Sequence, residues 1–121
     1  MPAKSKKSIF ISLSLPVIGV LVGILIGSSF PLTLPAQYSQ FMSVALLACL
    51  DSVFGGLRSA LEDKFDNEIF ITGFFTNALL AVGLVYVGYK LGIDLYYVSV
   101  LAFGLRIFQN LAIIRRHLLK K

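Results

Sequence analysis

Two ionisable residues, Asp51 and Arg106, lie inside long apolar stretches of this chain. A charged side chain in the hydrocarbon of a membrane is costly, so it faces a bundle interior, a partner or a water-filled cavity. At about 1.5 Å of rise per helical residue, Asn77 and Asn110 fall at a similar depth. We therefore predict an intramembrane polar cluster of Asp51, Asn77, Arg106 and Asn110.

Arginine suits a buried pair with a carboxylate, because its planar guanidinium can bond both carboxylate oxygens and stays charged. Two interpretations of an Asp51–Arg106 pair stay open at this point. The pair can fix the register of two helices, or it can line a polar cavity or bind a charged group of a partner.

The composition indicates the class of protein that holds these residues. The chain has 121 residues, of which 57% are hydrophobic and 14% charged, and its mean hydropathy is +0.86. Soluble domains carry about 25% charged residues. We therefore expect an all-α integral membrane protein that forms a single domain over residues 1–121.

The apolar residues form four stretches, each about as long as a helix that crosses a membrane, roughly 20 residues. Backbone groups in hydrocarbon must be bonded within the segment, so helices are expected rather than strands. The predicted transmembrane helices occupy residues 9–28, 38–57, 69–89 and 95–114. The first is longer than the apolar core of a signal peptide, so we expect a retained anchor.

Two connections have recognisable features. Leu57, Leu61 and Phe65 follow at i, i+4 and i+8, which predicts a short amphipathic helix between the second and third transmembrane helices. Arg58 and Glu62 would form an i,i+4 pair on a neighbouring face of it. Asp94 is placed to cap the fourth transmembrane helix.

The distribution of lysine and arginine predicts the orientation of the chain. With both termini cytoplasmic, the cytoplasmic side holds all of these basic residues except Arg106, which lies in the membrane, and Lys90, which lies outside. Cytoplasmic loops carry such an excess of basic residues. The tyrosines fall near the outer ends of the helices, as an interfacial aromatic belt does. These five are Tyr38, Tyr86, Tyr89, Tyr96 and Tyr97.

Small residues form stripes on two of the predicted helices. Gly19, Gly23 and Gly27 repeat every four residues, and Gly73 with Asn77 begins a similar stripe. Membrane helices approach closely over such stripes. The stripes serve packing within one chain, self-association or docking to another membrane protein.

The basic tail is expected to contact lipid headgroups or a partner protein, and nucleic acid is not expected. Its members are Arg115, Arg116, Lys120 and Lys121. His117 is the single histidine and Cys49 the single cysteine, so no histidine-based metal site or catalytic triad is predicted. No cofactor and no enzymatic activity are expected.

Three motifs resemble those of the bacterial small basic protein family, a membrane family of unknown function. The segment Asp51–Arg58 resembles its D-x-x-x-G-G-x-R motif through Gly55, Gly56 and Arg58, and Gly73–Asn77 resembles G-F-F-x-N. The stretch from Leu95 to Arg116, which holds Arg106 and Asn110, resembles its closing motif. The resemblance implies a bacterial inner-membrane protein encoded near genes for cell division or envelope biogenesis, and it implies no activity.

These observations lead to two hypotheses of different classes. The first is a membrane scaffold or accessory subunit that self-associates or docks other membrane proteins. The alternative is a small oligomeric transporter or channel, with a pathway lined by Asp51, Asn77 and Arg106.

Overall fold

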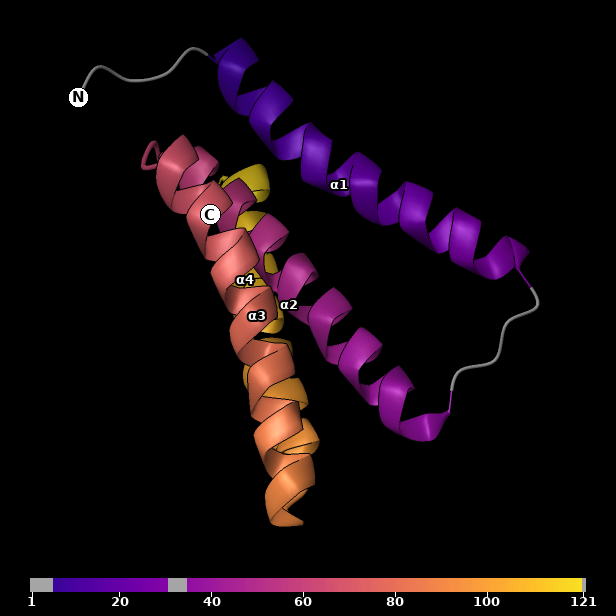
Figure 1. Cartoon of the computed structure of the whole chain (residues 1–121). Coiled ribbons are helices and arrows are strands. Elements are labelled where there is room, and N and C mark those ends of the chain that lie inside the picture. Colours follow the sequence, from indigo (N-terminus) through magenta and orange to yellow (C-terminus); the bar gives the residue numbers. More distant parts are fainter. Residues whose placement is uncertain (1–5, 31–34, 121) are drawn as a thin grey trace.

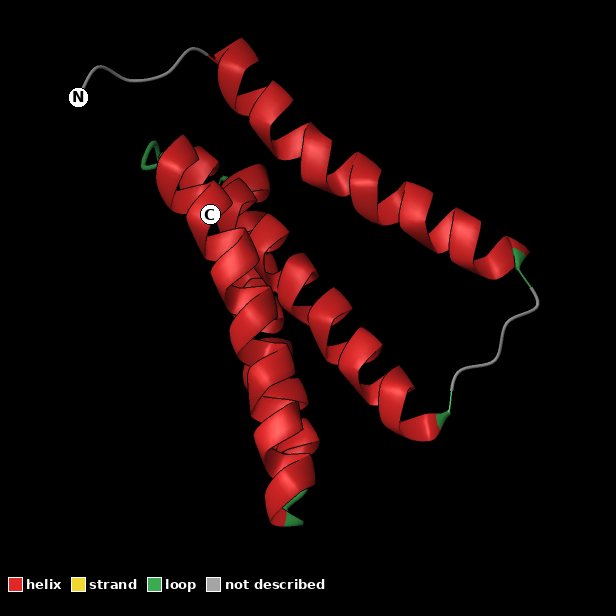
Figure 2. Cartoon of the chain, in the orientation of Figure 1, coloured by secondary structure: helices red, strands yellow, loops and turns green. Residues whose placement is uncertain are grey.

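The described residues fold into four helices (Figure 1). The computed structural model describes residues 6–30 and 35–120. The helices are α1 (Lys6–Ser29), α2 (Ala36–Leu61), α3 (Asn67–Leu91) and α4 (Leu95–Leu119). Among the described residues, everything outside these helices is turn or loop (Figure 2). The helices occur where the hydropathy predicts them, and each is longer than its predicted range.

Helices α2, α3 and α4 form a bundle in which α2 packs against both of the others. Helix α1 lies apart from this bundle along most of its length and approaches it near the C-terminal half of α2 (Figure 1). There, Leu13 of α1 comes next to Gly56 of α2 and Phe70 of α3.

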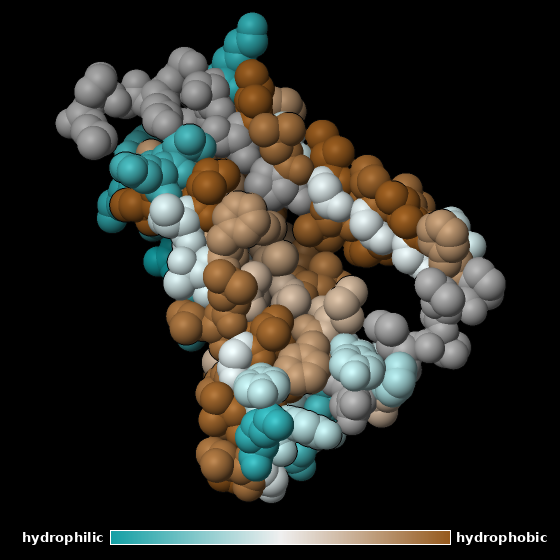
Figure 3. Space-filling model, in the orientation of Figure 1, coloured by the Kyte–Doolittle hydropathy of each residue, from teal (hydrophilic) through white to brown (hydrophobic). Residues whose placement is uncertain are grey.

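Small and medium-sized side chains fill the bundle core. Val44 and Ala48 of α2 pack with Ala81 and Val85 of α3, and Phe41, Val82, Tyr96 and Phe103 surround them. Most large apolar side chains instead point outward, so that apolar surface covers much of the face seen in Figure 3. Soluble proteins rarely expose large apolar patches, whereas membrane helices commonly meet through small residues and leave large ones to the lipid.

Three helices are long and apolar enough to cross a membrane, with candidate spans at Tyr38–Leu61, Asn67–Leu91 and Leu95–Leu119. At about 1.5 Å per residue, each exceeds the roughly 30 Å of bilayer hydrocarbon. The apolar part of α1, Leu13–Ser29, is shorter. A fourth crossing by α1 therefore stays a prediction.

The structure does not contain the predicted separate amphipathic helix between the second and third spans. Helix α2 continues without a break through Gly55 and Gly56 to Leu61. The chain then turns at Glu62 and Asp63, where Asp63 adopts φ 58°. Gly56 stays helical because it is buried against Phe70, where the two helices approach too closely for a larger residue. The predicted Arg58–Glu62 pair is present, with Nε and Oε1 3.2 Å apart.

Asp66 caps α3, although the sequence pattern pointed to Asp94 as a cap of α4. The Asp66 Oδ1 atom accepts hydrogen bonds from the backbone N–H groups of Glu68 and Ile69. Asp94 precedes α4 but its side chain forms no capping hydrogen bond. The tight α3–α4 turn explains the difference, since Gly92 at φ 73° and the Ile93 N–H bond to the Gly88 carbonyl hold Asp94 at φ −78° and ψ 67°.

The two ends of the bundle differ in chemistry. One cavity is lined by the end of α2 and the start of α3, and another by the end of α2 and the end of α4. These three helix ends therefore share one end of the bundle. This end holds Arg58, Lys64, Arg115, Arg116 and Lys120. A further cavity, lined by the start of α2 and the α3–α4 turn, lies at the other end. That opposite end holds all five tyrosines and Lys90.

Candidate functional site

Asp51 occupies the centre of the candidate site. It lies in the middle of α2, between α3 and α4, and only 1% of its surface is exposed. An isolated charge at such a position is strongly unfavourable unless an opposite charge or hydrogen-bond donors compensate it.

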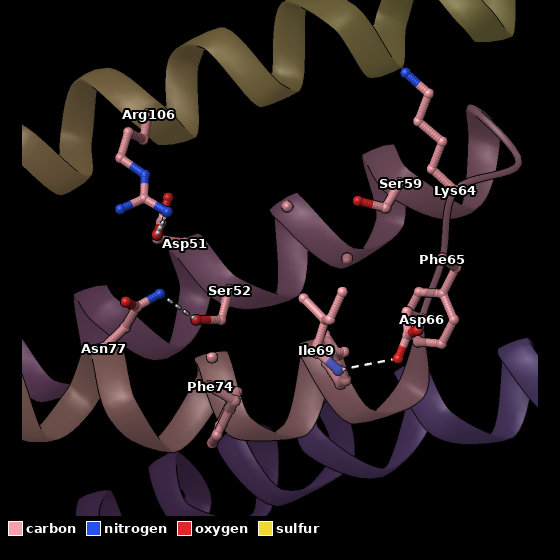
Figure 4. A pocket seen from close by; sticks show the side chains of 14 residues that line it. Asp51, Ser52, Ser59, Lys64, Phe65, Asp66, Ile69, Phe74, Asn77 and Arg106 are labelled. Atoms are coloured by element: carbon pink, nitrogen blue, oxygen red, sulfur yellow. Dashed lines mark hydrogen bonds and ion pairs between the residues drawn. The ribbon is translucent and has the colours of Figure 1, made fainter.

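Arg106 of α4 supplies the opposite charge within the same chain. Its Nη2 atom lies 3.0 Å from Asp51 Oδ2 (Figure 4). Its guanidinium also lies over the Phe103 ring, 5.8 Å from the ring centre, in a cation–π arrangement. The ion pair expected from the matched depths of the two residues is therefore formed.

The two partners differ sharply in exposure. The Asp51 side chain is 0% exposed, whereas 55% of the Arg106 side chain is exposed. Among the described residues, neither Asp51 oxygen accepts a hydrogen bond of good geometry. The 3.0 Å contact is therefore an electrostatic one in which the N–H bond is poorly aligned, and the carboxylate keeps capacity for further donors.

The two asparagines join α2 to its neighbouring helices. Asn77 Nδ2 donates to Ser52 Oγ over 3.2 Å and joins α3 to α2. Asn110 Oδ1 accepts from Arg58 Nη1 over 3.2 Å and joins α4 to α2. All four residues of the predicted cluster thus lie where α3 and α4 meet α2, and the two amides bond Ser52 and Arg58 rather than the Asp51–Arg106 pair.

Sequence reasoning missed Ser52, and it placed Arg58 on a surface helix. Arg58 instead bridges Glu62 and the buried Asn110, donating through Nε to the first and through Nη1 to the second. A continuous helix predicts this, because residues 51, 55 and 58 then share the face that meets α4. Ser52 follows Asp51 in the sequence, and the turn of the helix places its side chain on the side of α2 that faces α3.

A cavity of about 250 Å³ with a mixed polar and apolar lining opens beside the ion pair (Figure 4). Asp51, Ser52, Asn77 and Arg106 line one part of it, and aromatic side chains including Phe70 and Phe74 line another. The lining offers a carboxylate, a hydroxyl, an amide and a guanidinium to a small polar group. Among the described residues, no three metal-binding side chains lie together.

The predicted glycines have different surroundings. A Cβ atom at Gly56 would lie 2.7 Å from Phe70, and one at Gly55 would lie 3.7 Å from Asn110 Nδ2. Within the described residues, a Cβ atom at Gly73 would meet nothing within 4 Å. The same holds along the α1 stripe, at Gly19, Gly23 and Gly27. The structure therefore gives this stripe no role in packing within the described chain.

Of the predicted basic tail, Arg115, Arg116 and Lys120 extend from the last two turns of α4. Arg116 and Lys120 line a further cavity with Glu62 of α2, while Arg115 lines none of the cavities described. Lys121 lies outside the described residues.

Residues 34–119, which comprise α2, α3 and α4, match the family described as "Protein of unknown function (DUF1290)". The chain belongs to this family. It is 49% identical over 107 residues to the "Small basic protein" of Bacillus subtilis (strain 168), a similarity that covers 88% of each chain. The predicted family resemblance is thereby confirmed.

Two mycobacterial relatives of the chain are named as uncharacterised proteins. The chain is 41% identical over 99 residues to uncharacterised proteins of Mycobacterium bovis and Mycobacterium tuberculosis (strain H37Rv), covering 80% of this chain and 82% of each relative. No solved structure matches the chain. The family match begins at residue 34, so Asp51, Arg106 and their neighbours lie within it and the α1 glycine stripe does not.

Proposed function

We propose that this protein is a multi-pass membrane protein that acts as a scaffold or accessory subunit without enzymatic activity. The outward apolar side chains of the bundle and its core of small residues support insertion into a bilayer. Both termini are proposed to be cytoplasmic, because the basic end of the bundle would then lie on the side where lysine and arginine accumulate. The membrane is proposed to be the inner membrane of a bacterium.

The observation that carries this proposal is the uneven Asp51–Arg106 pair. The Asp51 side chain is fully buried, whereas 55% of the Arg106 side chain is exposed, along the side of α4 that borders α2. In a bilayer, a charged side chain exposed at this depth would meet hydrocarbon at a considerable cost. A helix of a second protein, or of a second copy, that covers this face would remove the cost, and Gln109 on the same face offers it an exposed amide.

The α1 helix offers a second surface for assembly. Gly19, Gly23 and Gly27 have open space around them, which suits close approach of another helix. A setting in cell division or envelope biogenesis is part of the proposal on the family resemblance alone, since the relatives' names describe no process.

Site-specific photo-crosslinking in native membranes tests the scaffold function. A photoreactive residue at Gln109, beside Arg106, should crosslink to a protein. The matched control is Leu79, an apolar residue of α3 that is 73% exposed, where lipid should be the main product. Equal protein crosslinking at both positions, or none at Gln109, would contradict a partner on the Arg106 face.

The cavity beside the ion pair favours the alternative of a transporter or channel, since Asp51, Asn77 and Arg106 line its wall together. The two functions predict different behaviour of Asp51→Asn. In a transporter this variant accumulates normally and loses flux in proteoliposomes. In a scaffold it lowers the amount of folded protein, and wild-type proteoliposomes carry no flux.

A further inference from the structure

A groove runs between α2 and α4 towards the basic end of the bundle. Its inner part is a cavity of about 370 Å³ that reaches from Arg106 to Glu62. Its outer part is a cavity of about 510 Å³ lined by Glu62, Ile113, Arg116, His117 and Lys120. Glu62 lines both parts, and we call the whole the α2–α4 groove. The outer cavity falls within the 300–1,000 Å³ typical of small-ligand sites.

The charges of the inner part are balanced. Arg106 pairs with Asp51, and Arg58 pairs with Glu62. Arg116 and Lys120, at the outer cavity, form no ion pair with any residue that the structure describes. The outer cavity therefore carries two uncompensated positive charges, placed one helical turn apart so that they repel each other. An anion bound between them would remove this repulsion.

The position of a basic residue at a helix C-terminus is favourable by itself, because the helix dipole is negative there. Arg116 lies in the last turn of α4, and Arg115 immediately precedes that turn. Only Arg116 lines the outer cavity. The cavity thus distinguishes two neighbouring residues of equal charge.

We propose that the outer cavity of the α2–α4 groove binds the phosphate headgroup of an anionic phospholipid through Arg116 and Lys120. Arginine binds phosphate oxygens with two parallel hydrogen bonds, and lysine adds a point charge. Basic pockets between transmembrane helices at the cytoplasmic side bind such headgroups. The inference rests on the membrane insertion proposed above, but not on which protein covers Arg106.

A lipid fits better than a soluble phosphate because apolar surface adjoins the cavity. Ile113 forms part of its wall, and Leu118 and Leu119 are exposed in the same turns of α4. Acyl chains can continue from there along the apolar outer face of α4.

Native mass spectrometry of the full chain in detergent micelles tests the inference. Dioleoyl phosphatidylglycerol and dioleoyl phosphatidylcholine are titrated separately, so that only the headgroup differs. The wild type should bind phosphatidylglycerol more tightly. Arg116→Gln and Lys120→Gln should each weaken that binding about fivefold, which is the contribution of one basic residue near a lipid surface. Arg115→Gln, with the same loss of charge, should bind as the wild type does.

Three results would overturn the inference: no preference for phosphatidylglycerol, equal losses in Arg115→Gln and Arg116→Gln, or displacement of the lipid by equimolar free glycerol phosphate. If Arg116→Gln loses its helical circular dichroism, Lys120→Gln, at the exposed end of α4, replaces it as the test variant. It should show the same fivefold loss of phosphatidylglycerol binding. A chain that washes off membranes without detergent overturns the proposed function too, whereas a detergent-dependent chain without lipid preference overturns this inference alone.

Discussion

Asp51 and Arg106 are unequal partners, because only Asp51 is shielded from the surroundings of the bundle. Removing the arginine leaves a buried carboxylate without its counter-charge. Removing the charge of the aspartate leaves a guanidinium that can still reach outward. The energetic consequence of breaking the pair should therefore depend on which side is changed.

We expect Arg106→Gln to lower the free energy of unfolding by about 3 kcal/mol, because breaking a buried pair from one side leaves an uncompensated charge. Asp51→Asn should lower it by about 1 kcal/mol, the cost of a poorly bonded buried amide. Unfolding in mixed detergent micelles, followed by circular dichroism, measures both. Equal losses would show that Asp51 is not desolvated in the folded protein.

The sequence predicted that the four polar residues lie at a similar depth. It did not predict how the helices that carry them are rotated about their axes. Depth along a helix follows from residue count, so the Asp51–Arg106 contact could be predicted. Which neighbour Asn77 or Asn110 meets depends on how α3 and α4 are rotated against α2, and that is set by packing of residues such as Ala48 and Ala81. No count along the chain supplies that angle.

At the scale of the elements, the helix ends and crossings rest on a few particular residues. Hydropathy predicts that the helices exist because burial in lipid requires about 20 apolar residues. It does not predict their ends, because polar residues outside the apolar stretch still continue a helix until the backbone turns. Helix α2 therefore runs past Arg58, and α4 continues beyond Ile114 to Leu119.

The capping residues offer a matched comparison. Asp66 has the extended backbone, φ −127° and ψ 119°, that lets its carboxylate reach the first N–H groups of α3, while Asp94 does not. Asp66→Ala should destabilise the protein by about 1 kcal/mol, and Asp94→Ala should have little effect. Hydrogen exchange of the amides of Glu68 and Ile69 reports the local loss. Faster exchange at α4 in Asp94→Ala would contradict this assignment.

The α2–α3 crossing depends on the missing side chain of Gly56. Gly56→Ala should lower stability by about 1–3 kcal/mol, because its Cβ atom would lie 2.7 Å from the Phe70 ring. Gly73→Ala, in open space on α3, is the control and should lose no stability. Thermal unfolding in detergent compares them. If Gly56→Ala is as stable as Gly73→Ala, the two helices do not approach as closely as described here.

At the scale of the whole molecule, the three-helix bundle and α1 make separate contributions. The bundle holds the polar contacts and the family match, whereas α1 touches it near Leu13 and leaves its glycines uncovered. An uncovered stripe contributes nothing to the stability of one chain. It can contribute to an assembly.

We expect Gly23→Leu to leave the thermal stability of the isolated chain unchanged, because nothing lies within 4 Å of a Cβ atom at this position. If the stripe packs against another helix, the same variant should shift the complex purified gently from native membranes to lower mass. The mass is measured by light scattering in detergent. An unchanged mass would assign the stripe to lipid contact.

The separation of residue types between the two ends has a practical consequence for experiments. The chain has five tyrosines and no tryptophan, and all five tyrosines lie at the end of the bundle opposite Arg58, Arg115 and Arg116. Its tyrosine fluorescence therefore originates from one face of any membrane that it crosses. An impermeant quencher added outside sealed vesicles would reveal which face that is, with no label attached and no residue changed.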